Sequence, residues 1–435
     1  MIATGCEVLF DGILVGYLAY TDDTGMATFE YTQEWVNDGF SLSPLHMPLS
    51  NRTFTFPLLS WNTYRGLPPV FADSLPDDFG NALIDAWLAR RGQDKSQFKA
   101  IDRLLYTGTR GMGALEYQPT NGPDEDESEP ILIGELVGMA QKVLDSRNNL
   151  QLSDHEESSM AKLLQIGTSA GGARAKAVIA VNEARTEIRS GQVTAPDGFE
   201  HFLLKFDGVE EHQSSNQSFG DPKGYGVMEY VYHLMAKEVG INMSHCELLR
   251  EENTSRAHFM TKRFDRGLGQ KHHVLSLCGI AHADFRQPGA FSYEEMLAIA
   301  RQIGLSNQEQ EQIYRRMVFN VVARNHDDHT KNWSFLVNDN YQWTLAPAFD
   351  LAWSYKVGSP WVETHQLSLA GKRDNFERND LLSVANLISN LRPSKASQII
   401  EDTIRVVSGW RELAEAEGVP VLLRDSVWNS FRLEL

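Results

Sequence analysis

Residues 121–130 constrain the fold of this chain more than any other segment. They read Asn-Gly-Pro-Asp-Glu-Asp-Glu-Ser-Glu-Pro, and two prolines around an acidic cluster cannot bury a hydrophobic core. We therefore predict a solvated linker that ends a first domain at about residue 120. A docking tail for a basic partner is the alternative interpretation of the same acidic run.

The distribution of apolar residues predicts an α+β fold around this linker. Short apolar stretches in residues 7–31 alternate with turn signals, which is typical of a β-meander, and residues 78–91 have helical spacing. Beyond the linker we expect a mainly helical segment, then two buried strands, and helix almost throughout beyond about residue 290. In order, these are 131–165, then 177–181 and 201–206, with 308–323 and 395–416 as the longest C-terminal helices.

Composition bounds the class of protein. With 435 residues, 42% of them hydrophobic and 23% charged, the chain is typical of a globular protein rather than a disordered one. The 58 acidic and 40 basic residues give a net charge of −18, which opposes indiscriminate binding to nucleic acid or anionic lipid. Three scattered cysteines indicate neither a disulfide framework nor a zinc site, and no apolar run suits a membrane span or a secretion signal. We therefore expect a cytoplasmic protein that does not bind a membrane.

The densest group of polar residues lies at 325–332, before an apolar stretch and Asp350. Asp327 precedes Asn332 by five residues, and Asp350 follows after an expected hairpin. Phosphoryl transfer to a hydroxyl uses such a set, because one carboxylate orients the attacking group while an asparagine and a second carboxylate bind Mg²⁺. The segment therefore predicts a kinase-like site.

Three upstream segments fit nucleotide-binding roles, and each has a plainer alternative. The small residues of 167–176 let backbone amides approach phosphates, although a tight turn without a ligand also demands glycine. Lys205 lies in an apolar strand and needs an anionic partner, either a phosphate or a carboxylate such as Glu229. Glu229 fits a solvent-facing position on an amphipathic helix equally well, and residues 262–266 are either a link between two lobes or a charged turn.

Taken in chain order, these parts match the sequence of parts in a two-lobed kinase. A small-residue loop, a strand lysine, a helix glutamate, a link, an Asp/Asn pair and a metal-binding Asp follow one another. The chain departs from the protein-kinase signatures, because it has no GxGxxG loop, Asn-His-Asp replaces His-Arg-Asp, and Phe-Asp-Leu replaces Asp-Phe-Gly. We therefore predict a divergent bilobal protein-kinase-like fold.

At these residues the chain resembles the HipA family, the serine/threonine kinase toxins of bacterial type II toxin–antitoxin pairs. Besides the N-terminal meander, the resemblance is carried by Phe71–Asp77, Gly108–Leu115, Ser169–Lys176, Lys205, Ala236–Gly240, Arg263–Arg266, Asp327–Asn332 and Pro347–Asp350. It implies three regions. These are an antitoxin-contacting subdomain at 1–120, a kinase N-lobe-like region at 131–264, and a mostly helical C-lobe at 265–435 that carries the catalytic and metal-binding residues.

The resemblance also implies roles for single residues. Asp327 is the implied catalytic base, and Asn332 and Asp350 are the implied Mg²⁺ ligands. Ser169 is the implied site of autophosphorylation in trans, with Thr168 as the fallback. The residues implied to bind ATP are Gly171, Gly172, Ala173, Arg174, Ala175, Lys176, Lys205, Lys262, Arg263, Phe264, Asp265, His329, Lys331, Asn332, Phe349 and Asp350.

Within that set the resemblance implies a division of labour. Residues 171–176 would cover the ATP phosphates and Lys205 would contact them. The backbone of Lys262 and Phe264 would meet the adenine, and Asp265 would lie near the ribose. The implied cofactors are therefore ATP and Mg²⁺.

The family resemblance implies several partners. The first subdomain would contact a HipB-like helix-turn-helix antitoxin, and operator DNA would be reached mainly through that antitoxin. A dimer within the antitoxin complex is also implied. The protein substrate would be of the kind that includes aminoacyl-tRNA synthetases.

Two other functions stay open at the level of the residues. One is an inactive, kinase-like corepressor, which would bind ATP without transferring phosphate. The other is an HD-type metal phosphohydrolase, in which His326 and Asp327 would bind metal together with His329 or His365.

Overall fold

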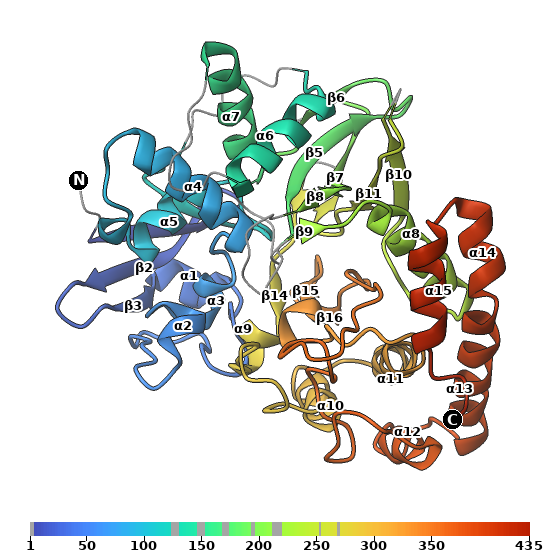
Figure 1. The fold of residues 1–435 in the computed structure, drawn as a ribbon. Coiled ribbons are helices and arrows are strands. Elements are labelled where there is room, and N and C mark those ends of the chain that lie inside the picture. The colour runs from blue at the N-terminus through green and yellow to red at the C-terminus, as the bar shows by residue number, and fades with distance from the viewer. Residues whose placement is uncertain are drawn as a thin grey trace. The chain divides into compact units, whose positions relative to one another are not determined.

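The computed structural model divides into two compact units, whose elements are labelled in Figure 1. Unit 1 comprises residues 1–42, 49–226 and 246–273, and unit 2 comprises residues 43–48, 227–245 and 274–435. The structure describes residues 4–122, 130–145, 153–167, 174–192, 196–210, 220–251, 254–267 and 270–435. Most of the predicted linker at 121–130 therefore lies outside the described residues.

Unit 1 begins with a four-stranded antiparallel sheet in the order β3-β2-β1-β4. Its strands are β1 (Gly5–Phe10), β2 (Ile13–Thr21), β3 (Met26–Tyr31) and β4 (Leu115–Gln118). From Gly16 to Thr21 buried and exposed residues alternate along β2, as expected of a strand with one face on the core. The predicted β-meander is confirmed.

Short helices lie between β3 and β4 in the sequence. They are α1 (Gln33–Asp38), α2 (Trp61–Tyr64), α3 (Pro69–Ala72), α4 (Asp78–Arg90) and α5 (Ala100–Thr107), with a 3₁₀ turn at Lys95–Gln97. α4 confirms the helix predicted over 78–91. It begins at Asp77, whose side chain accepts a hydrogen bond from the Gly80 amide and so satisfies one of the free N–H groups of the first turn.

The second sheet of unit 1 has five antiparallel strands in the order β10-β11-β7-β5-β6. They are β5 (Lys176–Asn182), β6 (Ile188–Ser190), β7 (Phe199–Lys205), β10 (Cys246–Arg250) and β11 (Ala257–Lys262). Two small hairpin sheets add β8 (Val209–Glu210) with β9 (Gly220–Asp221) and β12 (Arg266–Gly267) with β13 (Gln270–Lys271).

Two helices share a hydrophobic core with this second sheet, α6 (Ile133–Asp145) and α7 (Asp154–Gly167). The core includes Leu136 of α6, Leu163 of α7 and Ile179 of β5, together with Phe79 and Leu83 of α4. α4 therefore belongs to the same core as residues that follow the predicted linker.

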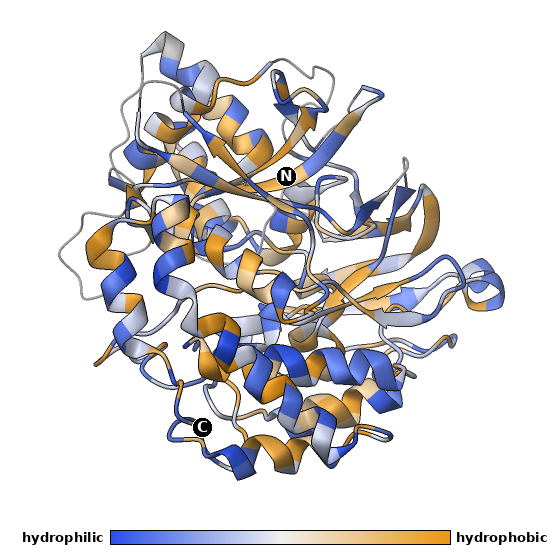
Figure 2. Cartoon of the chain, turned by 90° about the vertical axis from the view of Figure 1, so that its right-hand side faces the viewer, coloured by the Kyte–Doolittle hydropathy of each residue, from blue (hydrophilic) through white to orange (hydrophobic). Residues whose placement is uncertain are grey.

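Unit 2 is mostly helical. Its helices are α8 (Tyr225–Glu238, within unit 2 from Val227), α9 (Leu277–Ala281), α10 (Tyr293–Gln302), α11 (Asn307–Val322), α12 (Arg378–Ala385), α13 (Pro393–Ser408), α14 (Trp410–Glu417) and α15 (Val421–Ser430). A small antiparallel sheet has the order β14-β15-β16, formed by β14 (Val274–Ser276), β15 (Ser334–Val337) and β16 (Trp343–Leu345). Figure 2 shows hydrophobic and hydrophilic residues alternating along the C-terminal helices, as expected of helices with one buried face.

The α+β fold class predicted from the sequence is confirmed, with two corrections in unit 2. The helix expected over 395–416 is two helices, because α13 ends at Ser408 and Gly409, a residue of low helix propensity, separates it from α14. Helix almost throughout beyond residue 290 is wrong for residues 333–377. There β15 and β16 form the hairpin expected before Asp350, and an irregular segment follows. Among the described residues, no helix is both long and apolar enough to cross a bilayer.

Two glycines provide a matched test of the packing in unit 1. Gly226, in the first turn of α8, lies so close to Ala257 that an added Cβ would overlap the Ala257 carbonyl oxygen. Gly138 in α6 is exposed, and an added Cβ there meets nothing within 4 Å. We expect Gly226→Ala to lower the free energy of unfolding by about 1–3 kcal/mol, and Gly138→Ala to raise it by about 0.5–1 kcal/mol. Urea denaturation of both variants measures the two changes, and destabilisation by Gly138→Ala would contradict the packing described.

Candidate active site

The polar segment 325–332 leaves the end of α11 and is held by backbone hydrogen bonds on both sides. Arg324 adopts a positive φ of 54°, which turns the chain out of the helix. The His326 amide donates to the Ser354 carbonyl at 3.1 Å, and the His326 carbonyl accepts from the Gln366 amide at 3.3 Å. These contacts fix the backbone that carries Asp327.

Asp328 is the buried anchor of the segment. Its carboxylate accepts hydrogen bonds from the Tyr293 hydroxyl at 2.6 Å and the Gln366 amide at 2.7 Å, and it lies 2.8 Å from Nδ1 of His365. The Leu367 amide donates a longer bond at 3.3 Å. Burial by itself opposes the charged form, but His365 and these donors hold the pKa of Asp328 below its ordinary value. The group therefore stays ionised inside the protein.

Asp327, the preceding residue, has the opposite environment. Its side chain is 41% exposed, and its Oδ1 lies 3.6 Å from Nε2 of His329. Because Asp328 is drawn into the interior, its neighbour faces solvent with most of its acceptor capacity unused among the described residues. An exposed, oriented carboxylate of this kind can accept a proton from an incoming hydroxyl.

Asn332 is oriented by the same segment. It ends a 3₁₀ turn at Thr330–Asn332, and its Nδ2 donates to the Asp327 carbonyl at 2.7 Å. Because the amide nitrogen is used in this way, Oδ1 is directed away from the Asp327 backbone. The carbonyl-type oxygen is the atom that a hard cation binds.

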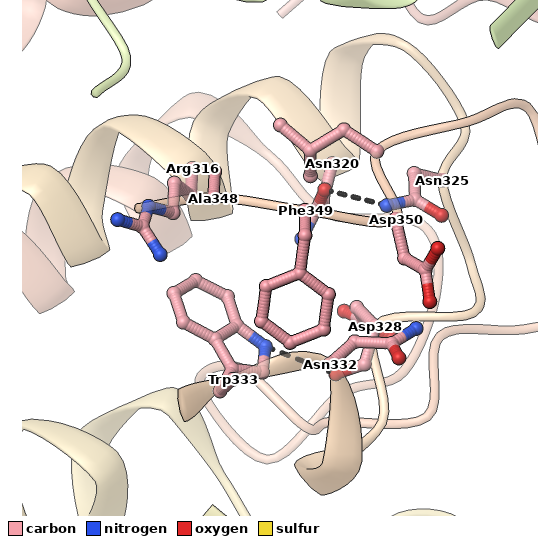
Figure 3. A pocket seen from close by; sticks show the side chains of 10 residues that line it. Arg316, Asn320, Asn325, Asp328, Asn332, Trp333, Ala348, Phe349 and Asp350 are labelled. Atoms are coloured by element: carbon pink, nitrogen blue, oxygen red, sulfur yellow. Dashed lines mark hydrogen bonds between the residues drawn. The ribbon is translucent and has the colours of Figure 1, made fainter. Parts of the chain in front are cut away.

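Asp350 comes from the segment after β16. It adopts a positive φ of 52°, a conformation that costs energy for a residue with a side chain and is often found at functional sites. Its chain is anchored two residues earlier, where the Ala348 amide donates to the Asn242 carbonyl at 2.8 Å. Figure 3 shows Asp350 and Asn332 among the side chains that line one small pocket of unit 2.

The donor set of this pocket fits Mg²⁺. Asn332 and Asp350 offer amide and carboxylate oxygens, which are the ligands this cation prefers, and both belong to the lining of the same pocket. No group of three or more His, Cys, Asp or Glu suited to a metal occurs in the part of the chain that the structure describes. Asn332 and Asp350 would give a cation two protein ligands, and Mg²⁺ commonly has one or two carboxylate ligands with substrate phosphates and waters completing its shell.

The pocket also contains residues that the sequence analysis did not identify. Asn325 Nδ2 donates to Asn320 Oδ1 at 2.9 Å, and Asn320 Nδ2 contacts the Tyr293 hydroxyl at 3.2 Å. Tyr293 in turn donates to Asp328, so a chain of hydrogen bonds links α10 and α11 to the polar segment. The signal that could have found Asn320 is a polar residue within the apolar face of the 308–323 helix.

Arg316, four residues before Asn320 on α11, is buried in the wall of this pocket. Its Nη2 donates to the Ala346 carbonyl at 2.7 Å, and its guanidinium lies 5.7 Å from the centre of the Trp333 ring. Burial lowers the pKa of Arg316 to about 9, so it remains a cation at neutral pH. Arg316 thus lines the same pocket as the two acidic residues Asp328 and Asp350, on the other side of Phe349 and Trp333 (Figure 3).

The histidines of an HD-type metal site have other contacts here. His326 is fully buried, its ring centre lies 4.1 Å from that of His365, and burial lowers its pKa to about 3. His365 faces Asp328 rather than Asp327. His326 and Asp327 therefore occupy different environments, which does not favour a shared metal.

The predicted nucleotide residues outside this pocket fall in two groups. Lys205 ends β7 as a buried side chain, and Lys262 ends β11 in an ion pair with Glu200. Both belong to unit 1, whereas Glu229, His329, Lys331 and Phe349 belong to unit 2. The ion pair between Lys205 and Glu229 therefore stays a prediction. The binding of one ATP by residues of both units stays a prediction as well. Gly171, Gly172, Ala173, Ser169 and Thr168 lie outside the described residues, whereas Arg174, Ala175 and Lys176 are described.

Asp265 is fully buried in unit 1, and its contacts are structural. Arg263 and Arg266 approach its carboxylate at 2.6 Å and 2.8 Å, and the Gly113 amide donates to it at 2.7 Å. The two arginines also reach the Gly111 carbonyl. The carboxylate thus ties the residue 111–113 segment to the end of β11, and the contact with ribose stays a prediction, as does adenine contact by Phe264.

Comparison with known proteins places this chain in a family. The HipA N-terminal domain matches residues 6–118, and the HipA-like C-terminal domain matches residues 168–410, more than half of the chain. The chain belongs to the HipA family. Putative kinase Y4mE of Sinorhizobium fredii is 25% identical over 431 residues, covering 91% of this chain and 92% of that protein.

A solved structure has the same fold as this HipA-family chain. It is HipA of Shewanella oneidensis MR-1 in a complex with HipB and operator DNA, with a TM-score of 0.66 and 15% sequence identity. The match covers 98% of this chain and 94% of that chain. The resemblance stated from the sequence motifs is therefore confirmed at the level of family and fold.

Replacing Asp328 tests whether its hydrogen bonds anchor the polar segment. We expect Asp328→Asn to lower the free energy of unfolding by roughly 1.5–3 kcal/mol, because an amide nitrogen would face backbone N–H donors. Tyr293→Phe removes one donor to Asp328 and the acceptor of Asn320 Nδ2, and it should lower the free energy of unfolding by about 1–3 kcal/mol. Urea denaturation ranks the two variants against Asp339→Asn, a change in the exposed β15–β16 turn. Equal stability of Asp328→Asn and Asp339→Asn would contradict the anchoring role.

Proposed function

We propose that this HipA-family chain is an ATP-dependent kinase that transfers the γ-phosphate to a serine or threonine of a protein. The observation that carries the proposal is the geometry of residues 327–332. An exposed Asp327 carboxylate and an Asn332 amide lie in one short segment, joined by the 2.7 Å bond from Asn332 Nδ2 to the Asp327 carbonyl. A catalytic base and a metal ligand have this relation in phosphotransferases.

Each residue of the pocket has a defined task in this proposal. Asp327 orients the hydroxyl of the substrate and accepts its proton as the oxygen attacks the γ-phosphorus. Asn332 and Asp350 hold Mg²⁺, which when bound would neutralise charge on the phosphates. Asp328 acts through the backbone, because it fixes the segment on which Asp327 and Asn332 lie.

The residues of unit 1 supply the nucleotide side of the proposal. Lys205 contacts the ATP phosphates and residues 171–176 cover them, while His329 and Lys331 of unit 2 are further proposed ATP-binding residues. Lys205 supports this role because it is a cation at the end of β7 and the direct cross-strand partner of Lys176, the last residue of the 171–176 segment. The cofactors proposed are therefore ATP and Mg²⁺.

We also propose a DNA-binding, HipB-like antitoxin as partner, contacted by residues 1–120. The Shewanella oneidensis relative occurs in a complex with HipB and operator DNA, which supports this partner. The net charge of −18 opposes direct binding of DNA, so contact with an operator would pass mainly through the antitoxin. A corepressor without kinase activity is the competing function, and the phosphotransfer assay below separates the two.

Two substitutions in the pocket distinguish the base from the metal ligand. We expect Asp327→Asn to lower the rate of phosphotransfer by roughly 10²–10⁴-fold while it leaves Mg²⁺–ATP binding nearly unchanged, because an amide cannot accept the proton. Asp350→Ala should instead weaken Mg²⁺–ATP binding, because it removes a charged ligand. Incubation with radiolabelled ATP measures transfer to the protein itself, and calorimetry measures the affinity.

The matched control is Asp339→Asn, which removes a carboxylate from an exposed turn of the same unit. It should transfer phosphate and bind Mg²⁺–ATP like the wild type. Full activity of Asp327→Asn would assign the base elsewhere. A wild-type protein that binds ATP without any transfer would favour the corepressor.

Ser169 is the proposed site of autophosphorylation. A phosphate adds about −1.5 to −2 charges beside the place proposed for the ATP phosphates, so repulsion should weaken ATP binding. Mass spectrometry of ATP-treated protein should find phosphate on Ser169, and Ser169→Ala should prevent the loss of affinity. If phosphate is found only on other residues, Thr168 included, Ser169 is not the residue whose phosphorylation limits the kinase.

A further inference from the structure

Both ends of the proposed phosphate loop approach α4. Gly167, the last residue of α7, precedes the loop, and Lys176, the last residue of the loop, is also the first residue of β5. A Cβ added to Gly167 would lie 2.8 Å from Leu83 Cδ1 of α4 and 3.4 Å from the Lys176 carbonyl oxygen. α4 comes from the N-terminal family domain, so that domain contacts both flanks of the loop (Figure 1).

A buried ion pair lies at this junction. Nζ of Lys176 is 3.2 Å from Oδ2 of Asp77, and the two side chains are only 2% and 3% exposed. The other oxygen of Asp77 caps α4 by accepting from the Gly80 amide at 2.6 Å. The carboxylate is thus held in place by the helix, and Lys176 is held in place by the carboxylate.

The charge state of the pair follows from its surroundings. Burial raises the pKa of Asp77 to about 6, while Lys176 and the Gly80 amide act in the opposite direction and Asp78 adds a small increase. Asp77 is therefore largely ionised at neutral pH. A buried lysine that loses such a partner keeps an uncompensated charge and must move toward water.

The strand register explains why the position of Lys176 affects the site. Lys176 of β5 and Lys205 of β7 are direct cross-strand partners, so their side chains leave the sheet on the same face. Like charges directly opposite each other are unfavourable. Asp77 supplies a negative charge to Lys176, the cross-strand partner of Lys205.

We propose that Asp77 is a positioning residue of the nucleotide site, which acts by pairing with Lys176. The pair fixes the end of the phosphate loop next to Lys205, and through it the N-terminal family domain controls the affinity for ATP. This inference rests on the proposed function, because it concerns the ATP site of that kinase. It adds a residue that acts through Lys176 rather than on the nucleotide.

A double-mutant cycle on the full chain tests the pairing. Asp77→Asn keeps an N-cap side chain on α4 and removes only the charge, whereas Lys176→Met removes the other half of the pair. We expect each variant to weaken Mg²⁺–ATP binding at least tenfold in calorimetry, and the double variant to be no weaker than either single variant. Lys176→Arg should restore most of the affinity. Asp94→Asn is the matched control, because Asp94 caps the 3₁₀ turn after α4 and accepts from Ser96 rather than a lysine.

The outcomes separate the inference from the proposed function. Wild-type affinity for Mg²⁺–ATP in a folded Asp77→Asn protein overturns the positioning role. It is also overturned if the loss of binding free energy in the double variant equals the sum of the losses in the two single variants. A purely structural pair would lower the melting temperature of both variants without changing their affinity, which also overturns it. Should Asp77→Asn fail to fold, wild-type affinity in Lys176→Met has the same meaning. Absence of Mg²⁺–ATP binding by the wild type would instead overturn the proposed function and this inference with it.

Discussion

The buried carboxylate of Asp328 is the interaction on which the candidate active site depends. A charge without contact to solvent is tolerated only when several donors surround it, and here these come from Tyr293 of α10 and from residues 365–367. Segments distant in the sequence are therefore fixed around one residue. Since side chains of adjacent residues diverge, the burial of Asp328 leaves Asp327 at the surface, where a proton acceptor is useful.

Buried aspartates have the same structural task in both units. Asp77, Asp207, Asp265 and Asp328 each accept a hydrogen bond from a backbone amide, of Gly80, Gly224, Gly113 and Gln366 in that order. Each also holds a charged or polar side chain or a second amide. Carboxylates suit this task because a single group offers about four acceptor positions and so joins several segments. Part of the acidic character of the chain thus serves the fold, rather than solubility alone.

Burial of polar side chains in unit 2 costs desolvation free energy, but it gives the pocket a fixed geometry. Arg316, Asn320 and Asn325 take positions that apolar residues could fill with less desolvation. Their hydrogen bonds connect α11 to Asp328 and to the backbone of Ala346, just before Asp350. Networks of this kind favour one arrangement of side chains over others, which a site for phosphoryl transfer requires.

Patterns in the sequence predicted several of the elements and the residue types of the candidate site. Apolar periodicity predicted the meander, α4 and α11, because each of these elements is formed by residues close together in the chain. The spacing of Asp327, Asn332 and Asp350 indicated the pocket for the same reason. Local pattern could not predict the burial of Asp328, since it depends on packing against distant segments. The break at Gly409 had a local signal, because glycine has a low helix propensity. Only the tertiary structure shows that the Gly113 amide donates to Asp265 and that Asp77 pairs with Lys176, because strand register and helix packing bring together residues about a hundred or more positions apart.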